Sequence, residues 1–189
     1  MPTLTQETEG RSDEEDQRSL QLNSVIVQQE MIKSVPNHPF SVTKTKVYLD
    51  NCSFTRPYDD QDQTRIHMET LAKMDIQKMI TSGDILLAAS DYLINENSMK
   101  KDEDIRDHIY NFVVKNVVIF VSDKDLRLDP IIKDVMESGV KDVDSAHVAA
   151  AIVAGCDYFI TTDDRILKYR TDRIKVVTPI QFLTENEVR

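Results

Sequence analysis

Four acidic residues stand where an α/β fold gathers its chemistry. Asp50 ends the run KVYLD, Asp163 comes just after DYFIT, and two further acids lie near expected helix starts, Glu96 in INENSM and Asp144 in KDVDSAH. Ligands of open parallel sheets bind beyond the carboxyl ends of the strands. Carboxylates that converge there repel one another unless a cation lies among them. Because these ligands are all oxygen atoms, a hard ion such as Mg²⁺ or Mn²⁺ is favoured.

An ordinary structural role is open for each of these acids as well. The chain contains 33 Asp and Glu residues, so an acid near a strand end is expected by chance. Asp144 could cap the helix that follows it, and Asp163 could cap the segment RILKY. Composition and spacing alone therefore predict an α/β domain with a candidate acidic metal site.

The elements that must position these acids alternate along the chain. Strands are expected at 46–50, 84–90, 117–121, 157–161 and 174–178, and helices at about 62–82, 90–98, 102–115, 130–138 and 144–154. The run VVIFV at 117–121 is continuously apolar, which is typical of a strand buried on both faces. Strands separated by helices indicate a mostly parallel sheet between helices.

The helix expected over 62–82 has two possible uses for its apolar residues. Ile66, Leu71, Met74 and Met79 recur at roughly helical spacing, which predicts a core face. The methionines of this helix, Met68 included, could equally form a surface for a partner. Gly83 is expected to end the helix.

Residues 1–45 differ in composition from the rest. The first 19 residues are polar and acidic, and we expect them to be disordered. Residues 20–35 mix apolar and polar side chains, and an irregular or partly helical arm or a short strand would fit them. Pro36 and Pro39 break any helix. We therefore divide the chain into an arm, 1–45, and a domain, 46–189.

Composition limits the class of protein. The chain has 189 residues, 40% of them hydrophobic, which suits one domain with a tail and excludes wholesale disorder. Its net charge of −10 makes nonspecific coating of nucleic acid by the whole surface a poor expectation. With only 2 cysteines, no secretory signal and no apolar run of about 18 residues, a cytoplasmic protein without a membrane span is expected.

Three segments resemble one known family. The segments are YLDNCSFTRPYDDQDQTRIHMET (48–70), SDYLINENS (90–98) and VKDVDSAHVAAAIVAGCDYFITTDDRILK (140–168). In order and content they are similar to the acidic segments of PIN domains, in the VapC-like toxin branch of that family. The resemblance implies a PIN-like α/β fold, with a mainly parallel five-stranded sheet flanked by helices. It also implies a Mg²⁺-dependent endoribonuclease, in which Mn²⁺ can substitute.

The resemblance also assigns roles to residues. Asp50, Glu96, Asp144 and Asp163 match the four catalytic, metal-binding acids, in that order. The last motif reads Thr-Thr-Asp-Asp here, where the family commonly has Thr-Asn-Asp, so Asp164 is a secondary candidate. Asp91 competes with Glu96, although capping suits its place at a helix start.

Neighbouring residues are candidates for binding the substrate. Asn51 and Thr161 stand beside proposed ligands and could orient water or contact a phosphate. Arg56 could hold the RNA backbone, or form a loop ion pair with Asp59 or Asp60. A basic stretch follows Asp163 and could line the substrate path or be solvated; it comprises Arg165, Lys168, Arg170 and Arg173.

His147 follows Asp144 by one helical turn, and packing or support of the site suits it better than acting as a base. Cys52 and Cys156 are expected to fill the core.

Rival α/β enzymes fit less well. A haloacid-dehalogenase-like phosphatase needs an acid two residues after its nucleophile, where this chain has Cys52. The resemblance implies the toxin of a toxin–antitoxin pair, with RNA as substrate, an antitoxin protein as partner and a homodimer as assembly. The alternative is a non-catalytic PIN module that acts as an interaction scaffold.

Overall fold

The computed structural model describes residues 44–187, which belong to a compact unit spanning Val42–Arg189. The expected arm lies almost entirely outside the described residues. In chain order the strands are β1 (Lys46–Leu49), β2 (Leu86–Ser90), β3 (Val117–Val121), β4 (Tyr158–Ile160) and β5 (Lys175–Val177). The α-helices are α2 (Asn51–Thr55), α3 (Thr64–Ser82), α4 (Asp91–Ser98), α5 (Glu103–Asn116), α6 (Leu128–Glu137), α7 (Asp142–Val153) and α8 (Pro179–Glu187). Two 3₁₀ turns, η1 (Arg56–Tyr58) and η2 (Ile166–Lys168), complete the described elements.

The five strands form one sheet in which every pairing is parallel, in the order β3-β2-β1-β4-β5. The prediction of an α/β unit with a mainly parallel sheet is therefore confirmed. In the register, Leu49 is paired with Ile160 of β4, and Tyr48 with Ala88 of β2. The central strand β1 thus delivers Asp50 to the sheet edge between the ends of β2 and β4.

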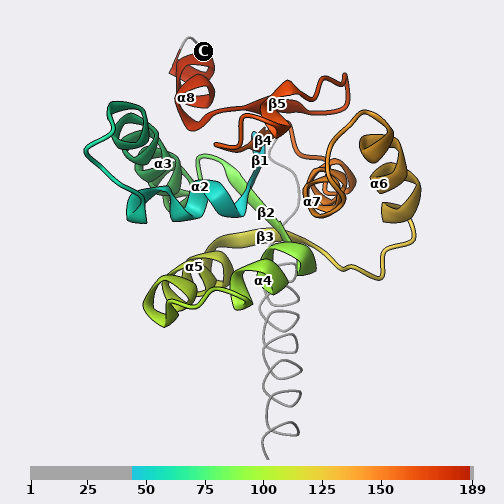
Figure 1. The fold of residues 1–189 in the computed structure, drawn as a ribbon, viewed down its shortest axis with the longest axis horizontal. Coiled ribbons are helices and arrows are strands. Elements are labelled where there is room, and N and C mark those ends of the chain that lie inside the picture. Colours follow the sequence, from blue (N-terminus) through green and yellow to red (C-terminus); the bar gives the residue numbers. More distant parts are fainter. Residues whose placement is uncertain (1–43, 188–189) are drawn as a thin grey trace, which may run out of the picture. The chain divides into compact units, whose positions relative to one another are not determined.

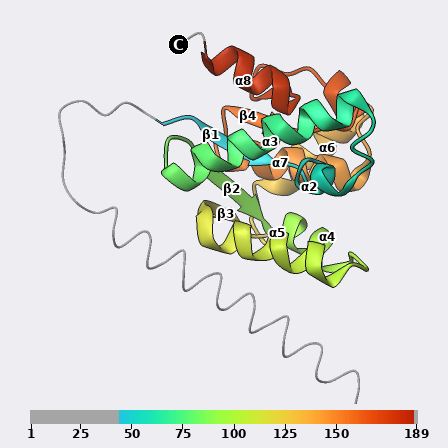
Figure 2. The ribbon, with the colours of Figure 1, turned by 90° about the vertical axis from the view of Figure 1, so that its left-hand side faces the viewer.

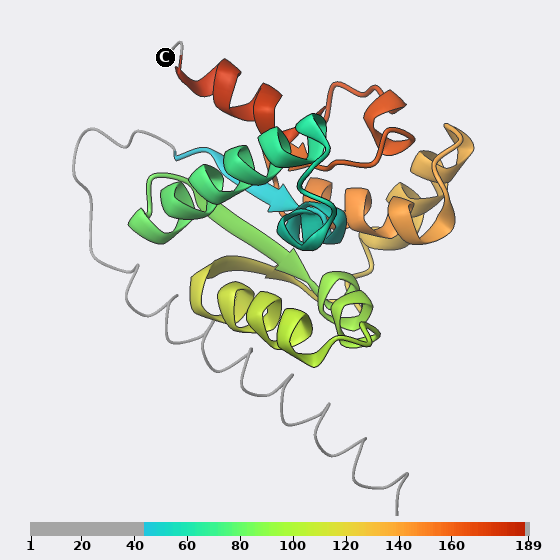
Figure 3. The ribbon, with the colours of Figure 1, turned by 60° about the vertical axis from the view of Figure 1, so that its left-hand side comes forward.

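Helices cover both faces of the sheet. Figure 1 shows α3 and α5 on one side and α6 and α7 on the other, with the sheet running from β5 to β3 between them. In Figure 2, α8 lies beside α3, and the two helices are in contact. Helix α7 is built from small residues, and its segment 145–151 is buried against the sheet, as its sequence predicts. Figure 3 shows β1 and β2 ending beside α2 and α4, so the helices that follow these strands begin at the same edge.

The orientation of α3 differs from the predicted core face. Gly83 ends the helix as expected, with a φ of 77° in the left-handed region that glycine adopts without strain. The buried face, however, consists of Glu69, Thr70, Ala72, Lys73, Ile76 and Ile80. Leu71 and Met74 are each 46% exposed, so the prediction that they form the core was wrong. The exposed apolar residues of this helix are Met68, Leu71 and Met74. Their exposure fits the alternative interpretation, in which the helix offers a surface to a partner.

Strand β3 also departs from expectation. Val118, Ile119 and Phe120 are only half-buried, because β3 is an edge strand of the sheet rather than a central one. The prediction that the continuously apolar run at 117–121 is buried on both faces was therefore wrong. No helix within residues 44–187 is long and apolar enough to cross a membrane.

Candidate metal centre at the carboxyl edge of the sheet

Asp50 is held rigidly where β1 ends. Its Oδ1 accepts a hydrogen bond of 2.8 Å from the backbone N–H of Asn51, which makes Asp50 the N-cap of α2. Its Oδ2 accepts a bond of 2.7 Å from the hydroxyl of Thr161 and one of 3.0 Å from the thiol of Cys52. Burial, followed by the negative charge of Asp50, raises the pKa of Cys52 to about 12, so the thiol stays protonated and keeps donating.

Thr161 and Cys52 therefore donate hydrogen bonds to Asp50 itself, which the sequence did not indicate. Thr161 is fully buried, and its hydroxyl also accepts a bond of 3.1 Å from the backbone N–H of Asp163. This geometry favours a role for Thr161 in orienting Asp50 and Asp163 over direct contact with a phosphate. Cys52 is a hydrogen-bonding neighbour of Asp50 and Thr161, whereas Cys156 is buried in the core as expected.

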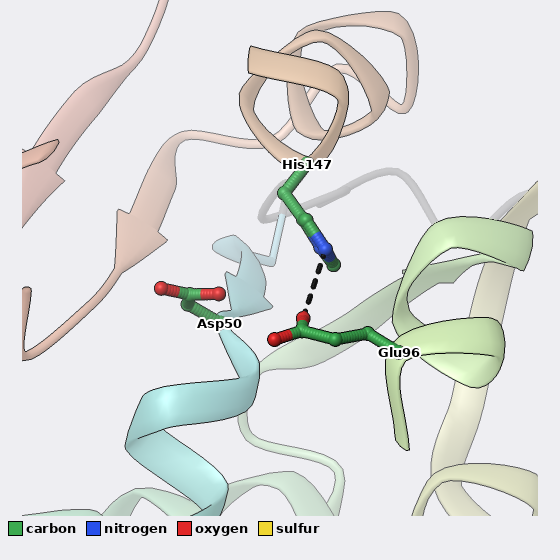
Figure 4. Close-up of side chains that lie close together, drawn as sticks. All are labelled: Asp50, Glu96 and His147. Carbon is green, nitrogen blue, oxygen red and sulfur yellow. Dashed lines mark ion pairs between the residues drawn. The ribbon is translucent and has the colours of Figure 1, made fainter. Parts of the chain in front are cut away.

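Glu96 reaches the same point from α4. Its Oε2 lies 3.0 Å from Nε2 of His147, and one side-chain atom each of Asp50, Glu96 and His147 lie within 4.8 Å of one another. Figure 4 shows the three side chains converging from the end of β1, from α4 and from α7, with the Glu96–His147 pair marked. These three residues form the compact part of the candidate metal centre.

Two buried hydroxyl groups, those of Tyr48 and Ser90, fix His147 on the Nδ1 side of its ring. The hydroxyl of Tyr48 lies 3.1 Å from Nδ1 of His147 and 2.7 Å from the hydroxyl of Ser90. Tyr48 itself is fully buried and stacks on Phe159, with ring centroids 5.5 Å apart. Because each ring nitrogen of His147 has a fixed neighbour, its orientation is determined by the fold. The sequence alone gave no sign that Tyr48 and Ser90 take part.

The surroundings keep Glu96 ionised. Burial raises the pKa of Glu96, but the contacts with His147, Asn51 and Lys100 outweigh it, so the net pKa lies below the ordinary value. Lys100, which was not a predicted site residue, stands four positions after Glu96. Burial lowers the pKa of its ammonium group, while the charges of Glu96 and Asp50 oppose that effect.

Asn51 lies in the same cluster. Its side chain is 1% exposed, and its Oδ1 accepts no hydrogen bond from any residue in the described range 44–187. A buried carbonyl oxygen without a donor is costly, and in a native protein it calls for a water or an ion. Its position beside Glu96 makes it a further oxygen that could face a cation.

Asp144 lies within electrostatic range of the other acids. Burial raises its pKa, and the negative charges of Asp50 and Asp163 raise it further, against smaller opposing effects from Arg165 and His147. The charges of the two neighbouring acids thus disfavour the ionised form of Asp144, although burial has the larger effect. The repulsion expected for converging acids is therefore present at Asp144.

The negative charge of Asp163 is balanced by the guanidinium group of Arg165. Both of its carboxylate oxygens face the guanidinium group of Arg165, and its Oδ1 accepts a bond of 2.8 Å from the backbone N–H of Arg165. This pairing lowers the pKa of Asp163 below the ordinary aspartate value. Asp163 thus closes the turn at Asp164 and Arg165, whereas the cap position of η2 is Arg165 and has no side-chain hydrogen bond, so the predicted cap of RILKY is not formed by Asp163. Asp163 also stays within electrostatic range of Asp144.

Two further candidates, Asp164 and Arg56, are engaged in ion pairs outside the Asp50–Glu96–His147 group, although Arg56 also donates a bond of 3.3 Å to the backbone carbonyl of Thr162. Asp164 is exposed and forms a two-bond pair with Arg65, at 2.9 and 2.7 Å. Arg56 pairs with Asp59 at 3.0 Å, the loop ion pair that was its alternative reading, and also with the buried Glu69 at 2.9 Å. Both arginines are thereby engaged in fixing η1 and α3.

The residues present fit a divalent cation. The cluster offers two carboxylates, one imidazole and the unpaired Oδ1 of Asn51, with Asp144 and Asp163 nearby. Carboxylate and carbonyl oxygens suit Mg²⁺ and Mn²⁺, and an imidazole nitrogen is better accepted by Mn²⁺ and other transition metals than by Mg²⁺.

Comparison with known proteins adds no name to this site. No protein-family model matches the chain, and no curated protein matches it significantly.

Proposed function

We propose that this protein is a metal-dependent endoribonuclease with a PIN-like fold. One observation carries the proposal: Asp50, Glu96 and His147 bring ligand atoms within 4.8 Å of one another at the carboxyl edge of the sheet. The raised pKa of Asp144, caused by burial and by Asp50 and Asp163, supports a site that calls for positive charge. The order of the acidic segments supports the nuclease class over other uses of such a metal.

The roles of the residues follow from their surroundings. Asp50 and Glu96 would hold Mg²⁺ or Mn²⁺, with Asp144 and Asp163 binding directly or through water. When bound, the ion supplies Lewis acidity toward a phosphate and lowers the pKa of an attached water. Thr161 and Cys52 keep Asp50 in place, and His147 keeps Glu96 in place. Hydrolysis would add water across one P–O bond of the RNA backbone.

The proposal extends to the biological class and the partners. We propose the toxin of a toxin–antitoxin pair, controlled by a small antitoxin protein, because the resemblance is to the VapC-like branch. The exposed side chains of Met68, Leu71 and Met74 on α3 support a homodimer, since exposed apolar residues that gather on one helix mark association sites. Light scattering at micromolar concentration tests the dimer, with Leu71→Glu expected to yield monomers.

A cleavage assay tests the activity. The purified full chain is incubated with a mixed-sequence RNA in Mg²⁺, in Mn²⁺ and in EDTA. Cleavage is expected only with metal, and Asp50→Asn and Glu96→Gln are each expected to lower the rate at least about 100-fold, the size of loss typical for a group that acts in the transition state. Asp75→Asn, on the exposed side of α3, is the control and should cut as the wild type does.

Growth experiments test the toxin class. Expression of the wild type should arrest a bacterial host, and expression of Asp50→Asn should not. Metal-independent RNA cleavage, or equal toxicity of the two forms, would contradict the proposal. A folded protein that binds Mn²⁺ but cuts no RNA would favour the interaction scaffold instead.

A further inference from the structure

A pocket of about 340 Å³ adjoins the acidic cluster. It lies between the segment that joins α6 to α7, the first turn of α7 and the turn η2. Asp144 lines this pocket and also lies within electrostatic range of Asp50 and Asp163, so pocket and metal centre share a wall. Its volume falls in the range of pockets that hold small ligands or parts of larger ones.

The rim of this pocket is cationic. Lys141, Arg165 and Lys168 all line it, and they come from two separate parts of the chain. The positive charge of Lys141 acts on Asp163, a member of the acidic cluster, and that of Lys168 acts on the neighbouring, exposed Asp164. Among residues 44–187, Arg165 pairs with Asp163, whereas neither lysine forms an ion pair. Two positive charges are thus available to an anion in the pocket.

Negative charge gathers near the start of α4. Around Tyr92, whose ring lies beside that of His147, the charges of four carboxylates act together; they belong to Asp91, Asp123, Asp129 and Asp142. A polyanion such as RNA is repelled by these carboxylates and attracted by the cationic rim.

We propose that the pocket bounded by Lys141, Arg165 and Lys168 is a second phosphate subsite, which holds the nucleotide next to the scissile bond. The inference rests on the proposed nuclease function and deepens it. The substrate is then a strand held at two successive phosphates, one at the acidic cluster and one in the pocket. A strand with internal phosphodiesters is preferred over a mononucleotide, which has only one phosphate to offer.

Arg165 would connect the two subsites. A cation at Asp163 competes with Arg165 for the same two carboxylate oxygens. A bound cation would weaken this ion pair, and the arginine, whose side chain is 60% exposed, would then be available to a phosphate in the pocket that it already lines.

Salt-dependent binding tests the subsite without cleavage. In the Asp50→Asn background, the dissociation constant of a short fluorescent single-stranded RNA is measured at increasing salt. Each phosphate contact on a single strand contributes about 0.7 to the slope of log K against log salt. Lys141→Ala and Lys168→Ala should each reduce that slope by about 0.7 and weaken binding several-fold, and the double variant should lose about 1.4.

Lys115→Ala is the matched control. Lys115 is an exposed lysine in the last turn of α5, which leads into the start of β3 at the opposite edge of the sheet. A double Lys141/Lys168 variant that binds RNA as tightly and with the same slope as Lys115→Ala would overturn the subsite.

Cleavage by the same variants in an otherwise wild-type chain separates the two proposals. Cleavage that persists unchanged in the double variant overturns the subsite and leaves the nuclease intact. Loss of RNA binding in the double variant, combined with a wild type that cuts no RNA, overturns the nuclease function and with it the subsite beside a scissile bond, and leaves the pocket as an RNA-binding site alone.

Discussion

Nε2 of His147 lies 3.0 Å from Oε2 of Glu96, and this contact joins α7 to α4 across the carboxyl edge of the sheet. Burial alone would raise the pKa of Glu96, and His147 is the first of the neighbours that lower it. The far side of the imidazole is fixed by the buried hydroxyl of Tyr48. His147 is thus a positioning residue for Glu96, whether or not it binds the metal itself.

His147→Ala should raise the pKa of Glu96, because burial is then opposed only by Asn51 and Lys100. A lowered pKa stabilises the fold above the ordinary glutamate value of about 4.3 and ceases to do so as the pH falls through the folded pKa. The variant should therefore lose that contribution to stability at neutral pH. Carbon-detected NMR titration of the Glu96 carboxyl reports the shift. An unchanged midpoint would show that His147 does not control Glu96.

Asp144→Asn should stabilise the metal-free protein at neutral pH. Burial and the charges of Asp50 and Asp163 raise the pKa of Asp144, so its ionised form is disfavoured in the folded state. That penalty is complete above the raised pKa and vanishes below the ordinary value of about 3.9. Thermal melts in EDTA should show a higher melting temperature for the variant at pH 7 and little difference at pH 3.

Asp142→Asn is the control for that prediction. Asp142 shares the first turn of α7 with Asp144, where the helix dipole favours negative charge. Its neutralisation should leave the melting temperature unchanged or lower it slightly. Equal stabilisation by both variants would point to a general charge effect instead of repulsion within the site.

The sequence indicated where in the fold the candidate site lies better than it indicated which residues form it. Asp50 and Asp163 follow strands that pair in parallel, so the rule for parallel sheets was sufficient to bring them to one edge. The partner of His147 was not predictable, because the contact with Glu96 depends on how α7 and α4 pack. The spacing of His147 three residues after Asp144 did place the two on one helix face.

The core face of α3 could not be predicted from periodicity. Leu71 and Met74 follow the helical repeat but are exposed, while the charged Glu69 and Lys73 are buried. Glu69 is buried because Arg56 and Arg65 both pair with it, and Lys73 lies over the ring of Phe54 at 5.9 Å. The contacts of Glu69 and Lys73 thus let charged residues share the buried face of α3 with Ala72, Ile76 and Ile80, which periodicity alone does not predict.

Glu69→Ala should destabilise the protein strongly. Its side chain is 2% exposed and pairs with Arg56 at 2.9 Å and with Arg65 at 2.8 Å. Its loss leaves the largely buried Arg56 with Asp59 as its remaining ion-pair partner, so the free energy of unfolding should fall clearly. Asp164→Ala removes the exposed partner of the same Arg65 and should cost much less, because exposed ion pairs contribute little to stability. Urea unfolding measures both, and similar losses for the two variants would contradict the buried role of Glu69.

Arg165→Gln should tighten Mn²⁺ binding and weaken RNA binding in the same protein. Arg165 occupies both oxygens of Asp163, so the metal must displace it to use that carboxylate. Because exposed ion pairs contribute little free energy, the gain in Mn²⁺ affinity should reach at most about fivefold in calorimetric titrations. Arg127→Gln is the control, because Arg127 pairs with Asp125 two residues earlier in the same geometry and does not line the pocket. If Arg165→Gln instead loosens Mn²⁺ binding while Arg127→Gln has no effect, Arg165 organises Asp163 for the metal and does not compete with it.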